Sequence, residues 1–436
     1  MAELGVKKYL VEGLPYLNER ADRDIEKYRK SDFILTLKDK SGNPLKDIEI
    51  HAVHKVHDFD FGCNIFMFDQ YETKAENVRY LEKLKKVFNT VVLPLYWEGT
   101  EPKHGYLRYD VDSDNDIYRR PPVMKAAQYC KKNGIRLKGH PLFWHEFIPN
   151  WLPENFEELK PLIEKRFEEI SSRFAADVPV FDCVNEPTRV WNVHHEHLND
   201  DWKHVVPPDD YCKWIFDTAS KHFPNNELVL NETVGASFSE FHGTYSAFYL
   251  NIKDLLSRGA KIDRIGLQCH TCDNPAFRNV YDASRMYEVL DTYAHFGKQL
   301  VLSEISVPSV FNGEIDEEFQ TQAAQMLYKI CFSHPMMSGI FWWNLTDDGV
   351  ATTKRKALGE NLPSTGLIDG DYNEKPAFKA IDNLINKQWR TDIILTTDDL
   401  GKIAFRGFDG EYEITVNGKA QRVHLNRNDN KKAVEY

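Results

Sequence analysis

Two glutamates end apolar runs that have the character of buried strands. Glu186 follows Asn185 at the end of one run, and Glu304 follows Ser303 at the end of another. A carboxylate at the mouth of a buried strand is costly unless it has a function. Two of them on separate strands of one sheet indicate acid/base or nucleophilic chemistry on a bond that lies between them.

Further side chains of the kinds that bind sugars lie near the ends of predicted strands. Glycoside hydrolysis needs one protonated carboxyl group to help the leaving oxygen depart, and one ionised carboxylate to attack or stabilise the anomeric carbon. Asn and Gln amides bind hydroxyl groups, and Trp offers a flat apolar face to a sugar ring. The candidate substrate-binding residues are His140, Trp144, Asn185, Gln268, His270 and Trp343.

Alternating strand and helix patterns from about residue 57 must position these side chains. Eight strand-like runs, separated by amphipathic stretches of helical period, predict a (β/α)₈ barrel whose strand ends converge on one face. No glycine-rich phosphate motif follows any of the strands, which argues against nucleotide binding. The predicted strands are 59–66, 90–95, 136–144, 178–185, 227–231, 264–270, 299–304 and 339–345. The predicted helices are 79–87, 156–174, 211–222, 245–258, 284–296, 317–332 and 376–385.

The flanks of the predicted barrel are rich in β patterns. Residues 33–37 and 48–53 are strand-like on either side of a turn, and the Asn417-Gly418 dipeptide separates two further strand-like runs, which is a strong hairpin signal. We expect residues 57–390 to form a catalytic barrel. We expect residues 28–56 and 391–436 to form a small β-rich accessory region, for which one sandwich is a possible arrangement.

Composition limits the partners of the chain. The 436 residues are 42% hydrophobic and 28% charged, with a net charge of −12. A negative charge spread along the chain argues against nucleic acid and anionic membranes as partners, and suits a neutral carbohydrate. Seven widely spaced Cys do not form a disulfide pattern. The first residues lack the apolar core of a signal peptide, so we expect a cytoplasmic protein, or a secreted or periplasmic one from which a signal was removed.

Five motifs in order resemble those of glycoside hydrolase family 10, the β-1,4-xylanases built on a (β/α)₈ barrel. They lie at 138–145, 182–187, 266–270, 302–305 and 366–378. The resemblance implies that Glu186 is the general acid/base and Glu304 the nucleophile of a retaining mechanism, with carboxyl groups about 5–5.5 Å apart. It implies no cofactor and no metal. It also implies that Asn185 binds the sugar 2-hydroxyl, that His270 keeps the nucleophile ionised, and that His140, Trp144 and Trp343 line the same sugar site.

The chain departs from the family pattern beside the reacting centre. Tyr96 stands where the family has a Lys, and Ser306 where it has an Asp that orients the histidine. Glu146 and Phe147 follow the third-strand motif where a Gln is usual, and residues 347–350 lack a second Trp. The residues of the reacting centre therefore predict the hydrolytic mechanism, whereas these departures leave the identity of the sugar substrate open.

Three alternatives to a xylan-cleaving enzyme stay open at this point. The same mechanism could act on another β-linked glycan or glycoside. The barrel could bind carbohydrate without catalysis. The histidines of 194–197, or the Cys-His-Thr-Cys run at 269–272, could hold a metal for hydrolysis.

Overall fold

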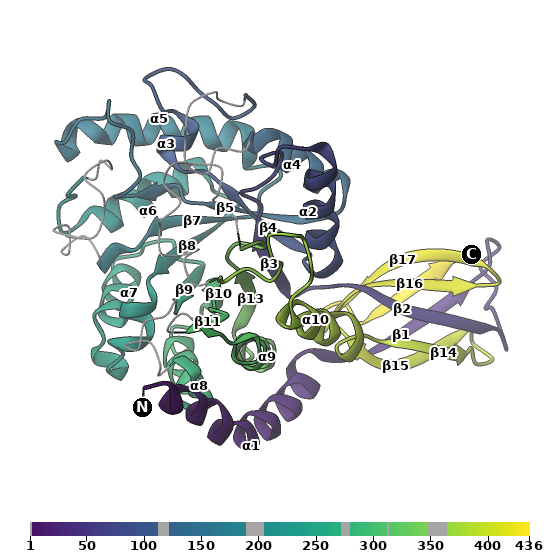
Figure 1. Ribbon diagram of the computed structural model, residues 1–436. Coiled ribbons are helices and arrows are strands. Elements are labelled where there is room, and N and C mark those ends of the chain that lie inside the picture. The colour runs from purple at the N-terminus through teal and green to yellow at the C-terminus, as the bar shows by residue number, and fades with distance from the viewer. Residues whose placement is uncertain (1, 112–121, 189–204, 272–279, 312–313, 348–363) are drawn as a thin grey trace.

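The structure is a computed structural model that describes residues 2–111, 122–188, 205–271, 280–311, 314–347 and 364–436. A parallel sheet closes on itself in the order β3-β4-β5-β7-β8-β9-β10-β13, and β13 pairs again with β3 (Figure 1). The short β6 (Phe143–Trp144) extends the third position and pairs with β7. The barrel strands are β3 (Asp60–Asn64), β4 (Thr90–Pro94), β5 (Arg136–His140), β7 (Val180–Asn185), β8 (Glu227–Glu232), β9 (Arg264–His270), β10 (Gln299–Ser306) and β13 (Met337–Trp342).

Helices connect successive strands and cover the outside of the barrel (Figure 1). Their apolar faces join the outward side chains of the strands in one large core. The connecting helices are α2 (Lys74–Val87), α3 (Trp97–Thr100), α4 (Val123–Lys132), α5 (Phe156–Phe174), α6 (Tyr211–His222), α7 (Ala247–Ser257), α8 (Ala283–Ala294), α9 (Glu317–Ser333) and α10 (Pro376–Asn383). Shorter elements are the turns Gly235–Ser239, Gly243–Tyr245 and Leu384–Gln388, and the strands β11 (Val310–Phe311) and β12 (Glu314–Ile315).

The predicted barrel is confirmed, and all eight predicted strands overlap observed ones. Two of the predicted helices, 156–174 and 211–222, have the observed bounds. Helix α4 was not predicted from the sequence.

The two flanks form a β-sandwich that projects from one side of the barrel (Figure 1). Phe33, Leu35, Tyr412 and Ile414 lie in its separate apolar core, and the ring of Phe33 meets that of Tyr412 edge-on at 5.7 Å. The Asn417-Gly418 hairpin is confirmed, with both residues at positive φ. One sheet has the order β15 (Lys402–Phe408), β1 (Lys30–Lys38) and β18 (Lys431–Glu435); the other has β14 (Asp392–Thr396), β2 (Glu49–His57), β16 (Gly410–Val416) and β17 (Lys419–Leu425).

A long N-terminal helix, α1 (Ala2–Tyr28), precedes the sandwich and packs against α8 and α9 (Figure 1). Leu17 and Ala21 are buried there, and the guanidinium of Arg20 donates two hydrogen bonds of 2.9 Å to Asp291. This helix was not predicted from the sequence. Its polar composition and internal Pro15 gave little local signal, and packing on the barrel supplies the stabilisation.

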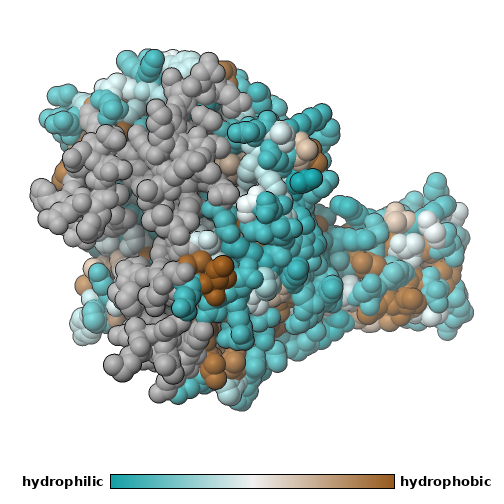
Figure 2. Space-filling view, in the orientation of Figure 1, coloured by the Kyte–Doolittle hydropathy of each residue, from teal (hydrophilic) through white to brown (hydrophobic). Residues whose placement is uncertain are grey.

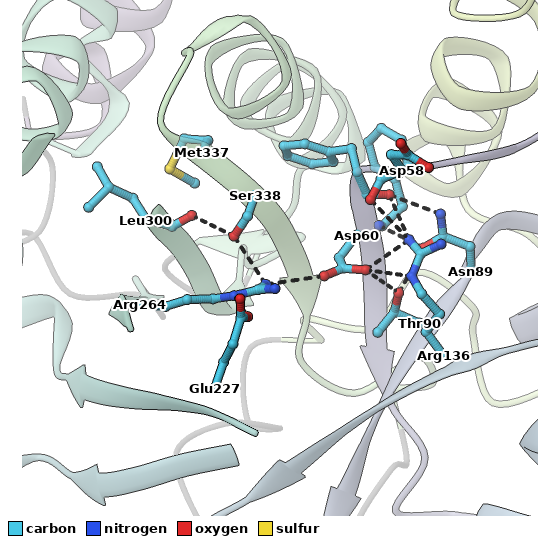
Figure 3. Close-up of polar contacts among 12 residues, drawn as sticks. Asp58, Asp60, Asn89, Thr90, Arg136, Glu227, Arg264, Leu300, Met337 and Ser338 are labelled. Carbon is cyan, nitrogen blue, oxygen red and sulfur yellow. Dashed lines mark hydrogen bonds and ion pairs between the residues drawn. The ribbon is translucent and has the colours of Figure 1, made fainter. Parts of the chain in front are cut away.

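A polar cluster closes the barrel at the amino-terminal ends of its strands (Figure 3). One oxygen of Asp60 accepts hydrogen bonds of 2.8 Å from Thr90 and Arg136, and its other oxygen lies 3.4 Å from Arg264. Arg264 also pairs with Glu227, the first residue of β8. Asp60, Arg136 and Arg264 line a cavity of about 170 Å³. Because this is the end of a barrel opposite the catalytic face, we assign the cluster a stabilising role.

On the face seen in Figure 2, the described residues are mostly hydrophilic, with small separate apolar groups. None of the helices in the described ranges combines the length and apolar character that a membrane span requires.

Candidate active site

Glu186 follows β7 at the carboxyl-terminal face of the barrel, with an unusual backbone conformation. Its φ is +53°, in the left-handed region that non-glycine residues seldom adopt. Its N–H donates a 2.7 Å hydrogen bond to the carbonyl of Asn231 on β8. The side chain is 5% exposed, and its Oε1 accepts a 3.0 Å hydrogen bond from the amide of Gln268 on β9. Left-handed residues of this kind concentrate at functional sites.

Glu304 lies on β10, and its two carboxylate oxygens have different partners. Oε1 accepts a 2.8 Å hydrogen bond from the Asn231 amide, and lies 3.9 Å from Nδ1 of His140. Oε2 lies 3.0 Å from Nε2 of His270. Burial raises the pKa of Glu304, but His140 and the hydrogen bond from His270 outweigh it and hold that pKa below its usual value. The site therefore favours the ionised carboxylate.

A continuous hydrogen-bond path connects the two glutamates. The Gln268 amide donates both to Glu186 and, at 3.3 Å, to Oδ1 of Asn185. The same Asn185 oxygen accepts a 2.8 Å bond from the Asn231 amide, which also donates to Glu304. Barrel closure brings together the side chains of β7, β8, β9 and β10.

The Asn231 amide at the centre of this path is oriented from its other side. Ser303 donates a 2.5 Å hydrogen bond to Oδ1 of Asn231, which leaves the amide nitrogen pointing at Asn185 and Glu304. Gly266 makes room for it, since a Cβ at that position would lie 2.3 Å from the Asn231 oxygen.

His270 is oriented by the residue that departs from the family pattern. Its Nδ1 lies 2.8 Å from Oγ of Ser306, and its Nε2 faces Glu304. A hydrogen-bond partner at one ring nitrogen fixes the direction of the other. Ser306 thus takes the orienting position for which the resemblance led us to expect an Asp.

His140 is held by a buried ion pair beneath the site. Oδ2 of Asp182 accepts from Lys138 and lies 2.7 Å from Nδ1 of His140. All three side chains are buried. Burial raises the pKa of Asp182, but Lys138 and His140 outweigh it and hold the pKa below its usual value. A negative charge is thereby kept against His140, which faces the nucleophile candidate.

Aromatic side chains from the ends of β13, β4 and β6 form a wall beside the two histidines. The fully buried ring of Trp343 meets His140 and His270 edge-on at 5.4 and 5.9 Å. Trp144 is partly exposed, and its ring stacks on Phe147 at 4.8 Å. Tyr96 is buried against Phe147, Trp144 and His140. The position where the resemblance expects a cationic Lys is thus occupied by an uncharged aromatic ring.

The structure brings all eight predicted site residues to this one face. Sequence reasoning missed Asn231, Glu232, Ser303, Asp182 and Lys138 as site residues, although Asn231 ends a predicted strand and could have been suspected for that reason. The histidines at 194–197 and Cys272 lie outside the described residues. Within the described ranges, no cluster of three or more His, Cys, Asp or Glu side chains has an arrangement that could hold a metal ion.

Known proteins resemble the chain in both sequence and fold. Anti-sigma-I factor RsgI6 of Acetivibrio thermocellus is 24% identical over 425 residues, which cover 95% of this chain and 49% of that protein. The chain therefore spans about half the length of this relative. Endo-1,4-beta-xylanase B of Thermotoga neapolitana is 25% identical over 320 residues, covering 71% of this chain and 84% of the xylanase.

Solved structures share the barrel. Xylanase 10B from Thermotoga petrophila RKU-1, in complex with xylobiose, has a TM-score of 0.56 and 22% identity, covering 76% of this chain and 94% of its own. At this identity the likeness supports the fold alone. The sequence model described as glycosyl hydrolase family 10 matches residues 57–384, most of the chain. The chain belongs to glycosyl hydrolase family 10.

Proposed function

We propose that this chain is a retaining β-glycoside hydrolase that cleaves β-1,4-xylosidic bonds in xylan or xylo-oligosaccharides. Glu186 acts as general acid/base and Glu304 as nucleophile. Asn185, Gln268, His140, His270, Trp144 and Trp343 bind the sugar around them. Family membership and the xylanase relatives support this proposal, together with the geometry of the site.

The reaction proceeds through two displacements at the anomeric carbon. In the first, the Glu304 carboxylate attacks that carbon, the glycosidic C–O bond breaks, and Glu186 gives its proton to the leaving oxygen. In the second, Glu186 takes a proton from water, whose oxygen attacks the same carbon and releases Glu304 as a carboxylate. Two inversions return the sugar to the β configuration.

The observation that carries the proposal is the hydrogen-bond path from Glu186 through Gln268, Asn185 and Asn231 to Glu304. It places a carboxylate with a lowered pKa opposite a second buried carboxyl group within one network. In an acid/base and nucleophile pair, one carboxyl group must be protonated while its neighbour is ionised. We expect the two carboxyl groups to lie about 5–5.5 Å apart in an experimental structure.

Glu304→Ala tests the assignment directly. The variant should melt like the wild type and release no reducing sugar from xylan or xylo-oligosaccharides. Glu157→Ala, an exposed residue on α5, is the matched control and should keep full activity. Proton NMR of the first product should show the β anomer. Full activity in Glu304→Ala, or an initial α anomer, would refute the mechanism.

A second candidate substrate is favoured by the aromatic wall. Tyr96 and Phe147 are buried side by side where a polar sugar-binding group was expected. An aromatic wall offers stacking and few hydrogen bonds, so the same mechanism could act on another β-linked glycan or on an aryl glycoside. Initial rates on a panel of β-linked polysaccharides and aryl glycosides decide between the two. Turnover of other members but of no xylan would select the second.

We also propose that residues 57–390 carry the catalytic unit, and that 28–56 with 391–436 brace it. The last Trp of the chain is Trp389, so the C-terminal strands lack the residue type that most often builds a sugar-stacking face. The bracing role would be contradicted if the Glu304→Ala variant still bound glycan after its active-site cleft was blocked, because the sandwich would then have a binding site of its own.

A further inference from the structure

A third carboxyl group beside the site has no part in the reaction as described. Glu232 is the last residue of β8, directly after Asn231, and is fully buried. Successive residues of a strand point to opposite faces. While Asn231 points into the hydrogen-bond path, Glu232 points away from it, toward Tyr211 and Cys212 of α6, which interact with it electrostatically.

The hydrogen-bond partners of Glu232 are Thr188 and Thr233, which reach it with backbone and side-chain groups. Its Oε2 accepts a 2.9 Å hydrogen bond from the N–H of Thr188, and its Oε1 a 2.7 Å bond from the N–H of Thr233. Among the described residues, no Lys, Arg or His side chain pairs with it. Burial raises the pKa of Glu232, so the fold keeps this group at a cost. A cost of this kind calls for a role.

Thr188 lies two residues after Glu186, and this places Glu232 in control of the acid/base segment. The left-handed backbone of Glu186 is held before the turn by its own N–H on the Asn231 carbonyl. It is held after the turn by the Thr188 N–H on Glu232. Consecutive residues of β8 thus fix both ends of the segment that carries the proton donor.

We propose that Glu232 is a positioning residue for proton transfer by Glu186: its carboxylate fixes the Thr188 backbone and so holds the Glu186 carboxyl group against the leaving oxygen. This inference rests on the proposed role of Glu186 as acid/base. General acid catalysis depends on hydrogen-bond reach to the atom that receives the proton, so a displaced backbone impairs it before it impairs sugar binding.

A purely structural role for Glu232 makes a different prediction. Loss of general packing would weaken the hydrolysis of every substrate to a similar extent. Loss of proton transfer would weaken only the substrates whose leaving group needs a proton. The dependence of kcat/KM on the leaving group therefore separates the two roles.

The test compares Glu232→Gln with the wild type on two aryl β-glycosides that share the glycone hydrolysed best by the wild type. The 2,4-dinitrophenyl leaving group departs without protonation, and the phenyl leaving group needs it. Glu232→Gln keeps the shape of the side chain but sets an amide NH₂ against a backbone N–H. We expect kcat/KM on the phenyl glycoside to fall about tenfold or more, within the range of general acid catalysis, while the dinitrophenyl value changes less than about threefold.

Glu227→Gln is the matched control, because Glu227 begins the same strand and belongs to the polar cluster at the opposite end of the barrel (Figure 3). It should leave the ratio of the two kcat/KM values unchanged. Glu232→Asp keeps the charge but withdraws it by one methylene, and should give an intermediate ratio. It also decides the question if Glu232→Gln does not fold.

An equal loss on both glycosides, or no loss on either, in a folded Glu232 variant would overturn the inference. A failure of the proposed function gives a different result, because the wild type itself would then hydrolyse neither glycoside.

Discussion

Replacing His270 by alanine is expected to move the acid limb of activity to higher pH. Glu304 must be ionised to attack, and Nε2 of His270 lies 3.0 Å from its Oε2. A hydrogen bond to a charged group contributes roughly 1.5–3 kcal/mol. Its loss should raise the pKa of Glu304, and the same free energy corresponds to roughly a 10–100-fold smaller ionised fraction at acidic pH.

The direction follows from the balance of forces on Glu304. Burial raises its pKa, while His140 and His270 lower it. Removing one of the lowering groups leaves burial less opposed, so a larger fraction of Glu304 is protonated at acidic pH. Activity should be lost at low pH by roughly 10–100-fold beyond any change in sugar binding, and that extra loss should vanish as the pH rises above the new pKa.

The assay is kcat/KM from about pH 3 to 8 on a dinitrophenyl glycoside, whose departure does not depend on the proton of Glu186. Ser306→Ala removes only the partner of His270 Nδ1, so it should shift the limb in the same direction by less. His222→Ala, on α6 and 3.8 Å from Glu164, is the control outside the site and should shift nothing. An unchanged acid limb in a folded His270→Ala would refute the account of how Glu304 is kept ionised.

Three further predictions concern stability and the geometry of the site. Asp182→Asn should lower the free energy of unfolding by about 3–5 kcal/mol in urea at pH 7, because Lys138 is left buried without its partner. Since the pKa of Asp182 is lowered, the stability that it contributes is present above the ordinary Asp pKa and is lost as the pH falls through the lowered value. The difference in unfolding free energy between variant and wild type should therefore narrow in strong acid. Gly266→Ala should push the Asn231 amide out of place and reduce kcat/KM at least about tenfold, and it should also lower the melting temperature because the added methyl group overpacks the barrel interior; unchanged kinetics in the folded variant would mean that the path between the glutamates is dispensable. Phe33→Ala, in the sandwich core, should cost about 3–5 kcal/mol of stability at that site and leave kcat/KM of the folded protein unchanged; a fall in kcat/KM would show that the sandwich acts on the active site.

The strands and helices of the barrel could be predicted because the local apolar pattern of each segment agrees with the element that it forms. The runs that became β7 and β10 are mostly apolar and are buried along almost their whole length, which is the pattern of a strand buried on both faces. Helices α5 and α6 carry apolar residues at helical spacing along their whole length. Helix α1 has a sparser apolar stripe, with Leu17, Ala21 and Ile25 buried between many charged residues, and it packs mainly against α8 and α9.

The active site was readable in part, for a related reason. Glu186 and Glu304 could be identified from the sequence as carboxylates at the ends of buried strands, and a parallel barrel places both on one face. In the sequence, Ser306 replaces the Asp expected to orient the histidine, but the Ser306 hydroxyl contacts His270 and orients it instead. Glu232 also follows an Asn at the end of an apolar run, as Glu186 does, but its link to the acid/base segment could not be predicted, because its partner Thr188 is 44 residues away in sequence.

The sequence by itself determined the kinds of elements, their order and the presence of two carboxyl groups at strand ends, because apolar periodicity and residue type are local properties. Only the tertiary structure decided what those carboxyl groups experience. The lowered pKa of Glu304 depends on imidazoles from β5 and β9, and the hold on Glu186 depends on β8. These groups meet because the barrel closes, and no spacing along the chain records which oxygen will face which donor.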